Sequence, residues 1–320
     1  MEKLFFLHTI TFLHVTSFYR NVIYFFGEVY ILILHAAGTL VGLAIGDALG
    51  APFEGMTVPV KRAFIRDYTS NRGRKPGFFT DDTGQALAVA ASLAACRGFS
   101  PEDMMARLVG SYLVDPDVYG PTSRVVYSLV LAGMDPRAAA RAAHRIRGSS
   151  RSNGSVMRGP PIGVFYAGPE LEAVSMACSR LTHHDPVAGA CSAFVNRMVS
   201  DLCRGAPRER AYGRALGRCR DDEVLALLGS LHRFDPVPGI DCLLATHAAV
   251  SAFMEHGTFE DTLVAAVSLG GDADTVGAIA GALAGACSGI GAVPRRWLAG
   301  LHDLSRVTRT AWRLAEASRA

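Results

Sequence analysis

Two short acidic segments, about 190 residues apart, combine carboxylates with hydroxyls at the start of apolar stretches. One is Phe79-Thr80-Asp81-Asp82-Thr83, and the other is Gly270-Gly271-Asp272-Ala273-Asp274-Thr275. Either segment alone is typical of a helix N-terminus with acidic first-turn residues, which the helix dipole favours. Because the same residue types recur at both places, the pair favours a shared role in binding ions.

The chemistry of these side chains indicates which ions they would bind. Carboxylate and hydroxyl oxygens suit hard cations such as Mg²⁺, Mn²⁺ or Ca²⁺, rather than Zn²⁺ or copper. Four carboxylates brought together would repel one another and would be partly protonated without compensating charge. Two divalent cations cancel four negative charges, so we predict a two-metal site, with Mg²⁺ as first choice and Mn²⁺ as the alternative.

The elements that must position these residues are predicted to be helices. Ala-rich stretches with 3.6-residue spacing recur from Ala36 onward, and alternating β-branched runs are nearly absent. Ser100, Asp135 and Asp185 each precede a proline, as a capping residue before the first helical position does. The predicted helices cover Gln85–Cys96, Pro101–Val114, Ser123–Ala132, Pro136–Ile146, Leu171–Leu181, Pro186–Cys203, Asp222–Leu231, Asp241–His256, Phe259–Leu269 and Asp274–Cys287.

Five segments rich in glycine or short polar residues interrupt this pattern and are predicted to be other than plain helix. They are Gly46–Gly55, Gly77–Thr83, Gly148–Gly163, Thr182–Asp185 and Gly270–Thr275. Loops placed at helix ends by a rigid scaffold commonly carry function. We therefore expect one all-α domain over residues 36–320, with these segments around its site.

Charge and cysteine content exclude several classes of partner and site. The net charge of +3 is small, and the arginine-containing stretch from Arg204 to Arg220 is typical of a solvated helix face, so no nucleic-acid partner is expected. The seven cysteines form no C-x-x-C pair, which argues against a zinc site or a disulfide framework. A reduced, intracellular protein is the better interpretation, and we expect it in the cytoplasm.

Residues 1–35 differ in composition from the rest of the chain, because they are rich in aromatics and contain no alanine. The uncharged stretch from Leu4 to Tyr19 includes His8 and His14 and falls short of the roughly 20 apolar residues of a spanning helix. No basic segment with a small-residue cleavage site is visible. We expect a packed or dispensable extension rather than a membrane contact.

Five ordered motifs together resemble the ADP-ribosylglycohydrolase family, over Ala36 to Trp297. The two acidic segments match its two metal motifs. The others are Leu43–Glu54 (LAIGDALGAPFE), Ser152–Gly163 with its SNGSVMR start, and Leu181-Thr182-His183. The resemblance implies an all-α bundle, a single large helical domain with a dinuclear metal site in its central cleft.

The resemblance also implies a role for individual residues. Metal ligands would come from both acidic segments: Thr80, Asp81, Asp82, Asp272, Asp274 and Thr275. Glu54 would lie on a mobile flap as general base or gate, and Asp82 could act as the base instead. Asn153, Gly154 and Ser155 would surround a diphosphate, and His183 would contact the ribose.

The activity implied is hydrolysis by water at the anomeric carbon, which releases ADP-ribose from an Arg- or Ser-linked protein side chain or from a small conjugate. The alternatives are a non-catalytic ADP-ribose binder or a crystallin-like structural protein of the same fold. Because all six ligand positions and Glu54 are present, the sequence favours the enzyme, which we expect to be a monomer.

Three features stay open at the level of sequence. Asp47 suits either a helix cap or a group that orients metal ligands. The glycines Gly277, Gly281, Gly285 and Gly289 recur every four residues and favour close helix packing over ligand contact. Arg158 would either hold the diphosphate loop in place or meet the anion directly.

Overall fold

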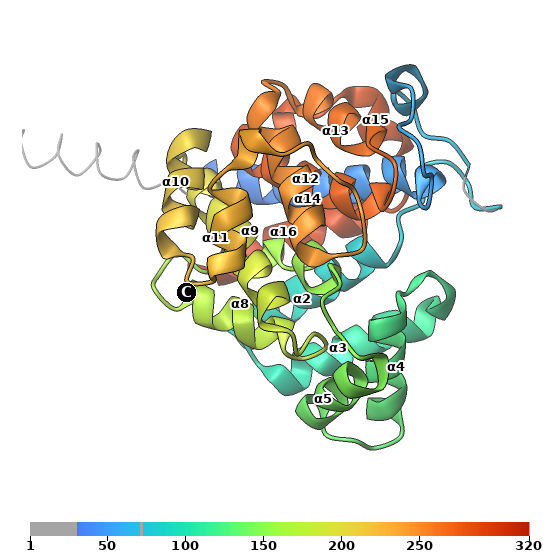
Figure 1. Ribbon diagram of the computed structural model, residues 1–320. Coiled ribbons are helices and arrows are strands. Elements are labelled where there is room, and N and C mark those ends of the chain that lie inside the picture. The colour runs from blue at the N-terminus through green and yellow to red at the C-terminus, as the bar shows by residue number, and fades with distance from the viewer. Residues whose placement is uncertain (1–30, 71–72, 320) are drawn as a thin grey trace, which may run out of the picture.

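The computed structural model describes residues 31–70 and 73–319, and the regular structure in these ranges is helical (Figure 1). Two isolated β-bridges join extended segments in these ranges, Met56 with Gly271 and Ser152 with Asp241. The prediction of an all-α fold is confirmed. The stretch from Leu4 to Tyr19, considered above for a membrane role, lies outside the described residues.

A long helix that includes residues 31–50 precedes the labelled elements. The α-helices that follow are α2 (Asp81–Cys96), α3 (Pro101–Val114), α4 (Pro121–Leu131), α5 (Pro136–Arg147), α6 (Gly154–Met157), α7 (Pro160–Phe165), α8 (Leu171–Ser179), α9 (Pro186–Cys203), α10 (Arg208–Arg218), α11 (Asp222–Leu228), α12 (Cys242–Glu255), α13 (Phe259–Ser268), α14 (Ala273–Ser288), α15 (Arg295–Gly300) and α16 (Leu304–Ala317). The 3₁₀ helices are η1 (Ala51–Phe53), η2 (Arg62–Ile65), η3 (Pro116–Val118), η4 (Leu231–Arg233) and η5 (Ile290–Ala292).

The helix prediction succeeds where caps and apolar spacing agree. Ser100, Asp135 and Asp185 each accept a hydrogen bond from a backbone N–H in the first turn of their helix. The prediction for Gly46–Gly55 is wrong in its first half, because residues 46–50 continue the long helix. The prediction also omits α6, α7, α10, α15 and α16, of which α6 and α7 lie in the segment Gly148–Gly163.

Glycines allow the backbone of the long helix to pack directly against that of α14, and they do not end the helix. The backbones of the two helices touch at three reciprocal pairs: Gly38 with Gly285, Gly42 with Gly281, and Gly46 with Gly277. A Cβ atom added at Gly46 would lie 1.9 Å from the carbonyl oxygen of Gly277, which no real side chain tolerates. The close-packing interpretation of the α14 glycines is confirmed for these three, whereas Gly289 has a φ of 69° and follows the end of α14.

Substitution of Gly46 by alanine is therefore expected to destabilise the protein by about 3 kcal/mol or more, because the added methyl group forces two backbones apart. The matched control is Gly213→Ala in α10, where an added Cβ meets nothing within 4 Å. That change should stabilise by roughly 0.5–1 kcal/mol through helix propensity. Urea unfolding of both variants measures the difference, and equal stabilities would contradict the packing argument.

The core of the molecule surrounds α14. Every residue from Ala273 to Ala286 is buried, as expected for a helix that is apolar on all sides. The segment Ile31–Phe53 has the length and composition of a membrane-crossing helix, but 72% of its most apolar window is buried in the protein. It packs here as a core helix, and α9, α12 and α13 cover other sides of α14.

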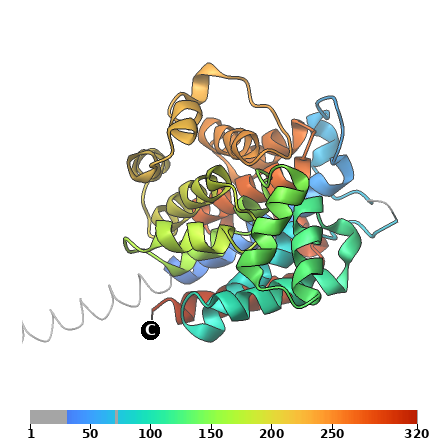
Figure 2. The same cartoon turned by 60° about the horizontal axis from the view of Figure 1, so that its bottom comes forward.

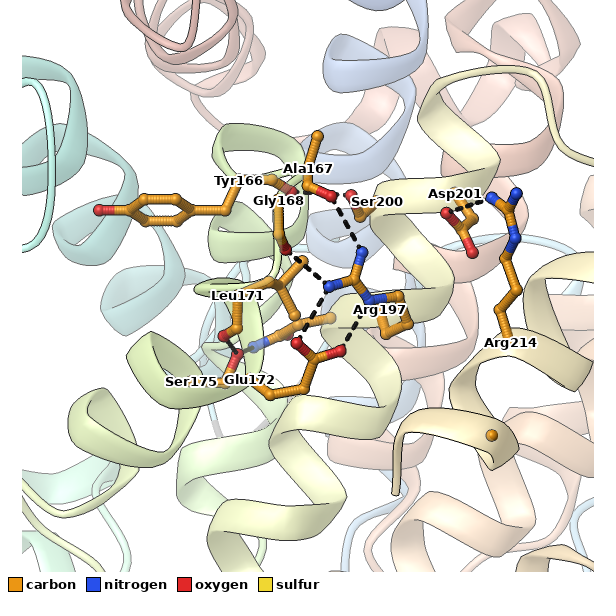
Figure 3. Close-up of polar contacts among 12 residues, drawn as sticks. Tyr166, Ala167, Gly168, Leu171, Glu172, Ser175, Arg197, Ser200, Asp201 and Arg214 are labelled. Carbon is orange, nitrogen blue, oxygen red and sulfur yellow. Dashed lines mark hydrogen bonds and ion pairs between the residues drawn. The ribbon is translucent and has the colours of Figure 1, made fainter. Parts of the chain in front are cut away.

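The remaining helices form outer layers. Figures 1 and 2 show the segment from α3 to α5, coloured teal to green, on one side of the molecule, away from α10 and α11 in yellow. A nearly buried arginine, Arg197, joins α8 to α9. Figure 3 shows its guanidinium on both carboxylate oxygens of Glu172, at 2.9 and 3.0 Å, and on the carbonyls of Ala167 and Gly168. This network fixes α9, which supports the loop containing α6.

Candidate functional site

The first acidic segment is held by a carboxylate from another helix. Asp47, on the long helix, accepts hydrogen bonds from the backbone N–H groups of Thr80 and Thr83, at 2.8 to 3.0 Å. It also accepts from both hydroxyls, at 2.9 and 2.6 Å. Because Asp47 takes the capping role, the side chains of Asp81 and Asp82 in the first turn of α2 remain available for other contacts.

The second acidic segment starts α14 after a tight turn. Gly270 and Gly271 have φ values of 74° and 61°, in the left-handed region that favours glycine. A Cβ atom at Gly271 would also lie 2.7 Å from the carbonyl oxygen of Pro238. This turn places Asp272 just before α14 and Asp274 in its first turn.

The two segments meet. Carboxylate oxygens of Asp47, Asp82 and Asp274 lie within 4.8 Å of one another, and all three residues are buried. Oxygens of Glu54, Asp272 and Asp274 meet the same condition. Asp274 belongs to both groups, so the five carboxylates form one continuous acidic cluster.

Burial and mutual repulsion oppose ionisation in this cluster. Burial raises the pKa of Asp82, and the neighbouring charges of Asp47, Asp81 and Asp272 raise it further. The pKa of Asp274 is raised by burial first and then by Asp82, Asp272 and Glu54. Burial, followed by repulsion from Asp47, raises the pKa of Asp81 to about 8, while burial raises that of Asp47 to about 6.

The residues present fit a group of divalent cations. The Oδ1 atom of Asp82 is buried and has no hydrogen-bond partner among the described residues, although a buried polar atom normally has one. The surrounding donors are oxygens, which hard cations prefer. A positive ion would bind the unpaired Oδ1 atom of Asp82 and would offset the repulsion that raises the carboxyl pKa values.

Glu54 stands on the exposed side of the cluster. The chain on either side of it is fixed to the second acidic segment, because the N–H of Gly55 donates to Gly271 O at 2.7 Å and that of Gly271 donates to Met56 O at 2.8 Å. These bonds place its carboxylate beside Asp272 and Asp274. The flap role implied by the sequence remains a prediction.

A cavity of about 360 Å³ opens above the acidic cluster. Its lining brings together all six predicted metal ligands with Glu54, Asn153, Gly154 and His183. Three arginines, Arg74, Arg124 and Arg147, also line it. The cavity therefore combines acidic groups with guanidinium groups, an arrangement that can hold both cations and an anionic ligand.

The loop before α6 forms another wall. Asn153 donates from Nδ2 to Asp272 Oδ2 at 2.6 Å, which ties this loop to the second acidic segment. Gly154 allows close approach, since a Cβ there would lie 3.0 Å from the ring of His183. Ser155 differs from its neighbours: its hydroxyl donates to Ala188 O on α9 at 3.2 Å, and the residue does not line the cavity.

His183 is buried and neutral. Burial lowers its pKa to about 3, and the nearby charge of Arg158 acts in the same direction. Its Nδ1 and Nε2 atoms lie 2.7 and 2.8 Å from the hydroxyls of Thr182 and Ser152. The imidazole can therefore take part in neutral hydrogen bonding at the cavity wall.

Arg158 supports the site from the protein interior. It is fully buried, does not line the cavity, and donates to Gln85 Oε1 and Cys178 O, each at 3.1 Å. Tyr127 donates to the same Gln85 oxygen at 2.8 Å. With its oxygen so occupied, Gln85 turns its amide nitrogen toward Asp81 Oδ2, at 2.8 Å. Of the two roles left open for Arg158, the structure favours holding the predicted diphosphate loop in place, because its contacts join that loop to α2 and α8.

Replacement of Gln85 by leucine should lower stability by about 3 kcal/mol, because it leaves a buried cation and a buried hydroxyl without their acceptor. It also frees Asp81 from the donor that fixes its rotamer, so turnover should fall as well. Ser251→Ala is the matched control, since that buried hydroxyl has no partner among the described residues. Thermal unfolding of both variants measures the effect, and similar melting temperatures would contradict this role for Gln85.

Two parts of this site, Gln85 and Tyr127, have no role in the sequence analysis. Asp47, for which two roles stayed open, caps α2. Gln85 lies one helical turn after Asp81, a spacing that places both side chains on one face of α2. No comparable signal connects Tyr127, because its contact joins residues far apart in the chain.

The comparison with known proteins agrees with this geometry. A family profile described as ADP-ribosylglycohydrolase matches residues 32–320. ADP-ribosyl-dinitrogen reductase glycohydrolase of Rhodospirillum rubrum is 31% identical over 286 residues, which cover 83% of this chain and 90% of that protein. ADP-ribosylarginine hydrolase Tri1 of Serratia proteamaculans is 27% identical over 295 residues, which cover 87% and 78% respectively.

A solved structure has the same fold. It is described as an ADP-ribosylglycohydrolase-related protein complex and is 32% identical in sequence. The superposition has a TM-score of 0.78 and covers 90% of this chain and 99% of the other. Similarity therefore extends across the whole helical region that contains the acidic cluster.

Proposed function

This chain belongs to the ADP-ribosylglycohydrolase family of hydrolases, and from that premise we propose that it is a metal-dependent enzyme that removes ADP-ribose from modified protein side chains. The observation that carries the proposal is the acidic cluster shared by two distant helix starts. A binder of ADP-ribose alone would not need five carboxylates held together against their own repulsion.

The chain offers specific residues for the cations. Thr80, Asp81 and Asp82 from one side and Asp272, Asp274 and Thr275 from the other line the cavity and supply only oxygen donors. Asp47 is a further candidate through its place in the buried triplet. Bound Mg²⁺, or Mn²⁺ as the alternative, would supply positive charge at the ribose and lower the pKa of a water molecule.

Two carboxylates are candidates for accepting the proton of the attacking water. Glu54 is our first choice, because it stands on the exposed side of the cluster, where water reaches it. Asp82 is the alternative, since its unpaired Oδ1 atom can accept a proton or a cation. A general base must lie within hydrogen-bond reach of the proton that it removes.

The opposite side of the cavity suits the anionic part of the ligand. Arg124 and Arg147 bring positive charge to the lining, and Gly154 exposes backbone beside His183. We assign the diphosphate to the Asn153–Gly154 segment and the ribose to His183, which can exchange hydrogen bonds without a change of charge. A contribution of Ser155 would come through its backbone, because its hydroxyl faces α9.

The names of the relatives guide the choice of acceptor linkage. The relatives named above act, by their names, on dinitrogen reductase and on ADP-ribosylarginine. We therefore place arginine linkage first and serine linkage second.

The decisive experiment offers Arg-linked and Ser-linked ADP-ribosylated peptides to the purified protein, with Mg²⁺, with Mn²⁺ and with a chelator. Release of ADP-ribose that requires a cation is the expected result. Glu54→Gln is the matched variant: it should bind ADP-ribose normally, measured by calorimetry, and hydrolyse its conjugates slowly. Absence of release from both peptides under every metal would overturn the enzyme assignment.

A further inference from the structure

A stripe of arginines lies on α5, which contains no acidic residue. Arg137, Arg141 and Arg145 follow one another at intervals of four residues, so they share one face of the helix. All three are exposed, and within the described ranges none of their guanidinium groups donates a hydrogen bond or forms an ion pair. The stripe is thus available to a partner.

The fold does not require this stripe. Like charges four residues apart destabilise a helix by a few tenths of a kcal/mol per pair. The helix dipole favours cations only in the last turn, where Arg145 lies, whereas Arg137 occupies the first turn, where a cation is disfavoured. Local helix energetics therefore account for Arg145 alone.

Arg180, which follows α8, extends the stripe. The ring of His184 lies between, 5.6 Å from that of His144 on α5. Burial lowers the pKa of His184, and the charges of His144, Arg141, Arg180 and Arg145 lower it further. The adjacent Asp185 is an acidic group, but its carboxylate caps α9. We call Arg137, Arg141, Arg145 and Arg180 the basic surface.

The C-terminal end of α5 reaches the catalytic cavity. Arg147, at the end of α5, lines that cavity together with Ser152. Ser150 connects the two regions, because its hydroxyl lies 2.8 Å from His144 Nδ1 and accepts from the N–H of His184 at 2.9 Å. A polypeptide with its modified side chain in the cavity would therefore pass close to the end of α5, from which the basic surface runs along the helix.

We propose that the basic surface docks an acidic polypeptide segment of the substrate, so that the preferred substrates are proteins with Asp or Glu around the ADP-ribosylated residue. The inference rests on the proposed function and narrows its substrate class. A small ADP-ribose conjugate would leave the surface unused.

The composition of this region favours polypeptide over nucleic acid as the partner. Met134, before α5, and Ile146, near its end, are 38% and 65% exposed. Arginine and methionine are enriched in protein–protein interfaces. Single-stranded nucleic acid is usually held by stacking on aromatic side chains, and the sequence of α5 contains no Phe, Tyr or Trp.

The kinetic test reverses two charges that lie outside the cavity. The double variant Arg141→Glu/Arg145→Glu is compared with Arg210→Glu/Arg218→Glu on α10, which Figure 1 shows on the other side of the molecule. Hydrolysis of an ADP-ribosylated peptide with Glu on both flanks should lose about 10- to 100-fold in kcat/KM, mainly through KM. A peptide with neutral flanks should change less than about twofold, and the α10 variant should match the wild type.

A binding test separates this inference from the enzyme assignment. A fluorescent Glu-rich peptide without ADP-ribose is titrated with metal-free protein at low salt and followed by anisotropy. Binding that is lost in the α5 variant, kept in the α10 variant and abolished by high salt supports the inference, even if no conjugate is hydrolysed. No binding, or binding that survives the α5 reversal, would overturn it. Equal binding of single-stranded DNA of the same charge would also overturn it, in favour of a general polyanion surface.

Discussion

The variant Asp274→Asn is expected to lose turnover almost entirely, to below about one-thousandth of the wild-type rate, while the protein stays folded. Asp274 is the residue shared by both acidic triplets, so its loss removes a candidate ligand from each. The metal-free variant should also melt at a higher temperature than the metal-free wild type. The reason is that asparagine replaces a carboxyl group that burial, and then repulsion from Asp82, Asp272 and Glu54, keep from ionising in the folded state, which costs stability at neutral pH.

Rates of ADP-ribose release, and melting curves with and without Mg²⁺, measure the two effects. The matched control is Asp222→Asn, which changes an exposed aspartate in the first turn of α11. It should leave both quantities unchanged. If Asp274→Asn retained a rate within tenfold of the wild type, the acidic cluster would not be where catalysis depends on a cation.

Metal-free protein is expected to lose stability as the pH rises from 6.5 to about 8, and a divalent cation is expected to restore it. Asp81 has a pKa of about 8 in the folded protein against an ordinary 3.8, and those of Asp82 and Asp274 are also raised. The folded state thus keeps protons that the unfolded state releases, and the free energy of unfolding falls with pH. Each such carboxyl contributes about 1.4 kcal/mol per pH unit.

The pH range begins at 6.5 because the titration of His183 below that pH changes the stability in the opposite direction. The pKa of its ring falls from 6.5 to about 3 on folding, so its contribution to stability is complete above pH 6.5 and is lost below it. Urea unfolding with chelator at several pH values, repeated with Mg²⁺, gives the two curves. Asp81→Asn should flatten the chelator curve. A metal-free stability that rises over this window would contradict the raised carboxyl pKa values.

The sequence predicts the fold well where local signals dominate. Pro101–Val114 and Pro186–Cys203 begin at a capped proline and end as predicted. The long helix is harder to predict from the sequence, because glycines such as Gly42, Gly46 and Gly50 are more typical of turns than of helices. Their role depends on glycines of α14 more than 200 residues later, and contact with a distant backbone leaves no local periodicity.

For the candidate site, the predicted ligands do share one cavity, which the repeated Asp and Thr pattern indicated. The structure adds what supports them. Asp47 caps a helix from outside it, and Arg158 reaches Asp81 only through Gln85. Such contacts depend on the direction of side chains from different helices, which composition and spacing do not specify. The departure of Ser155 toward α9 has the same origin.

The glycine contacts between the long helix and α14 also determine how far the site tolerates substitutions elsewhere in the protein. Asp47 directly follows Gly46, and Asp274 lies three residues before Gly277. Both aspartates therefore lie close to the backbone contact between Gly46 and Gly277. The separation of their Cα atoms is set by main-chain contacts, which have no rotamers to adjust. Changes of side chain elsewhere in the interior should therefore alter melting temperature long before they alter the spacing of these donors, and thermostabilised forms of the enzyme should keep their cation preference.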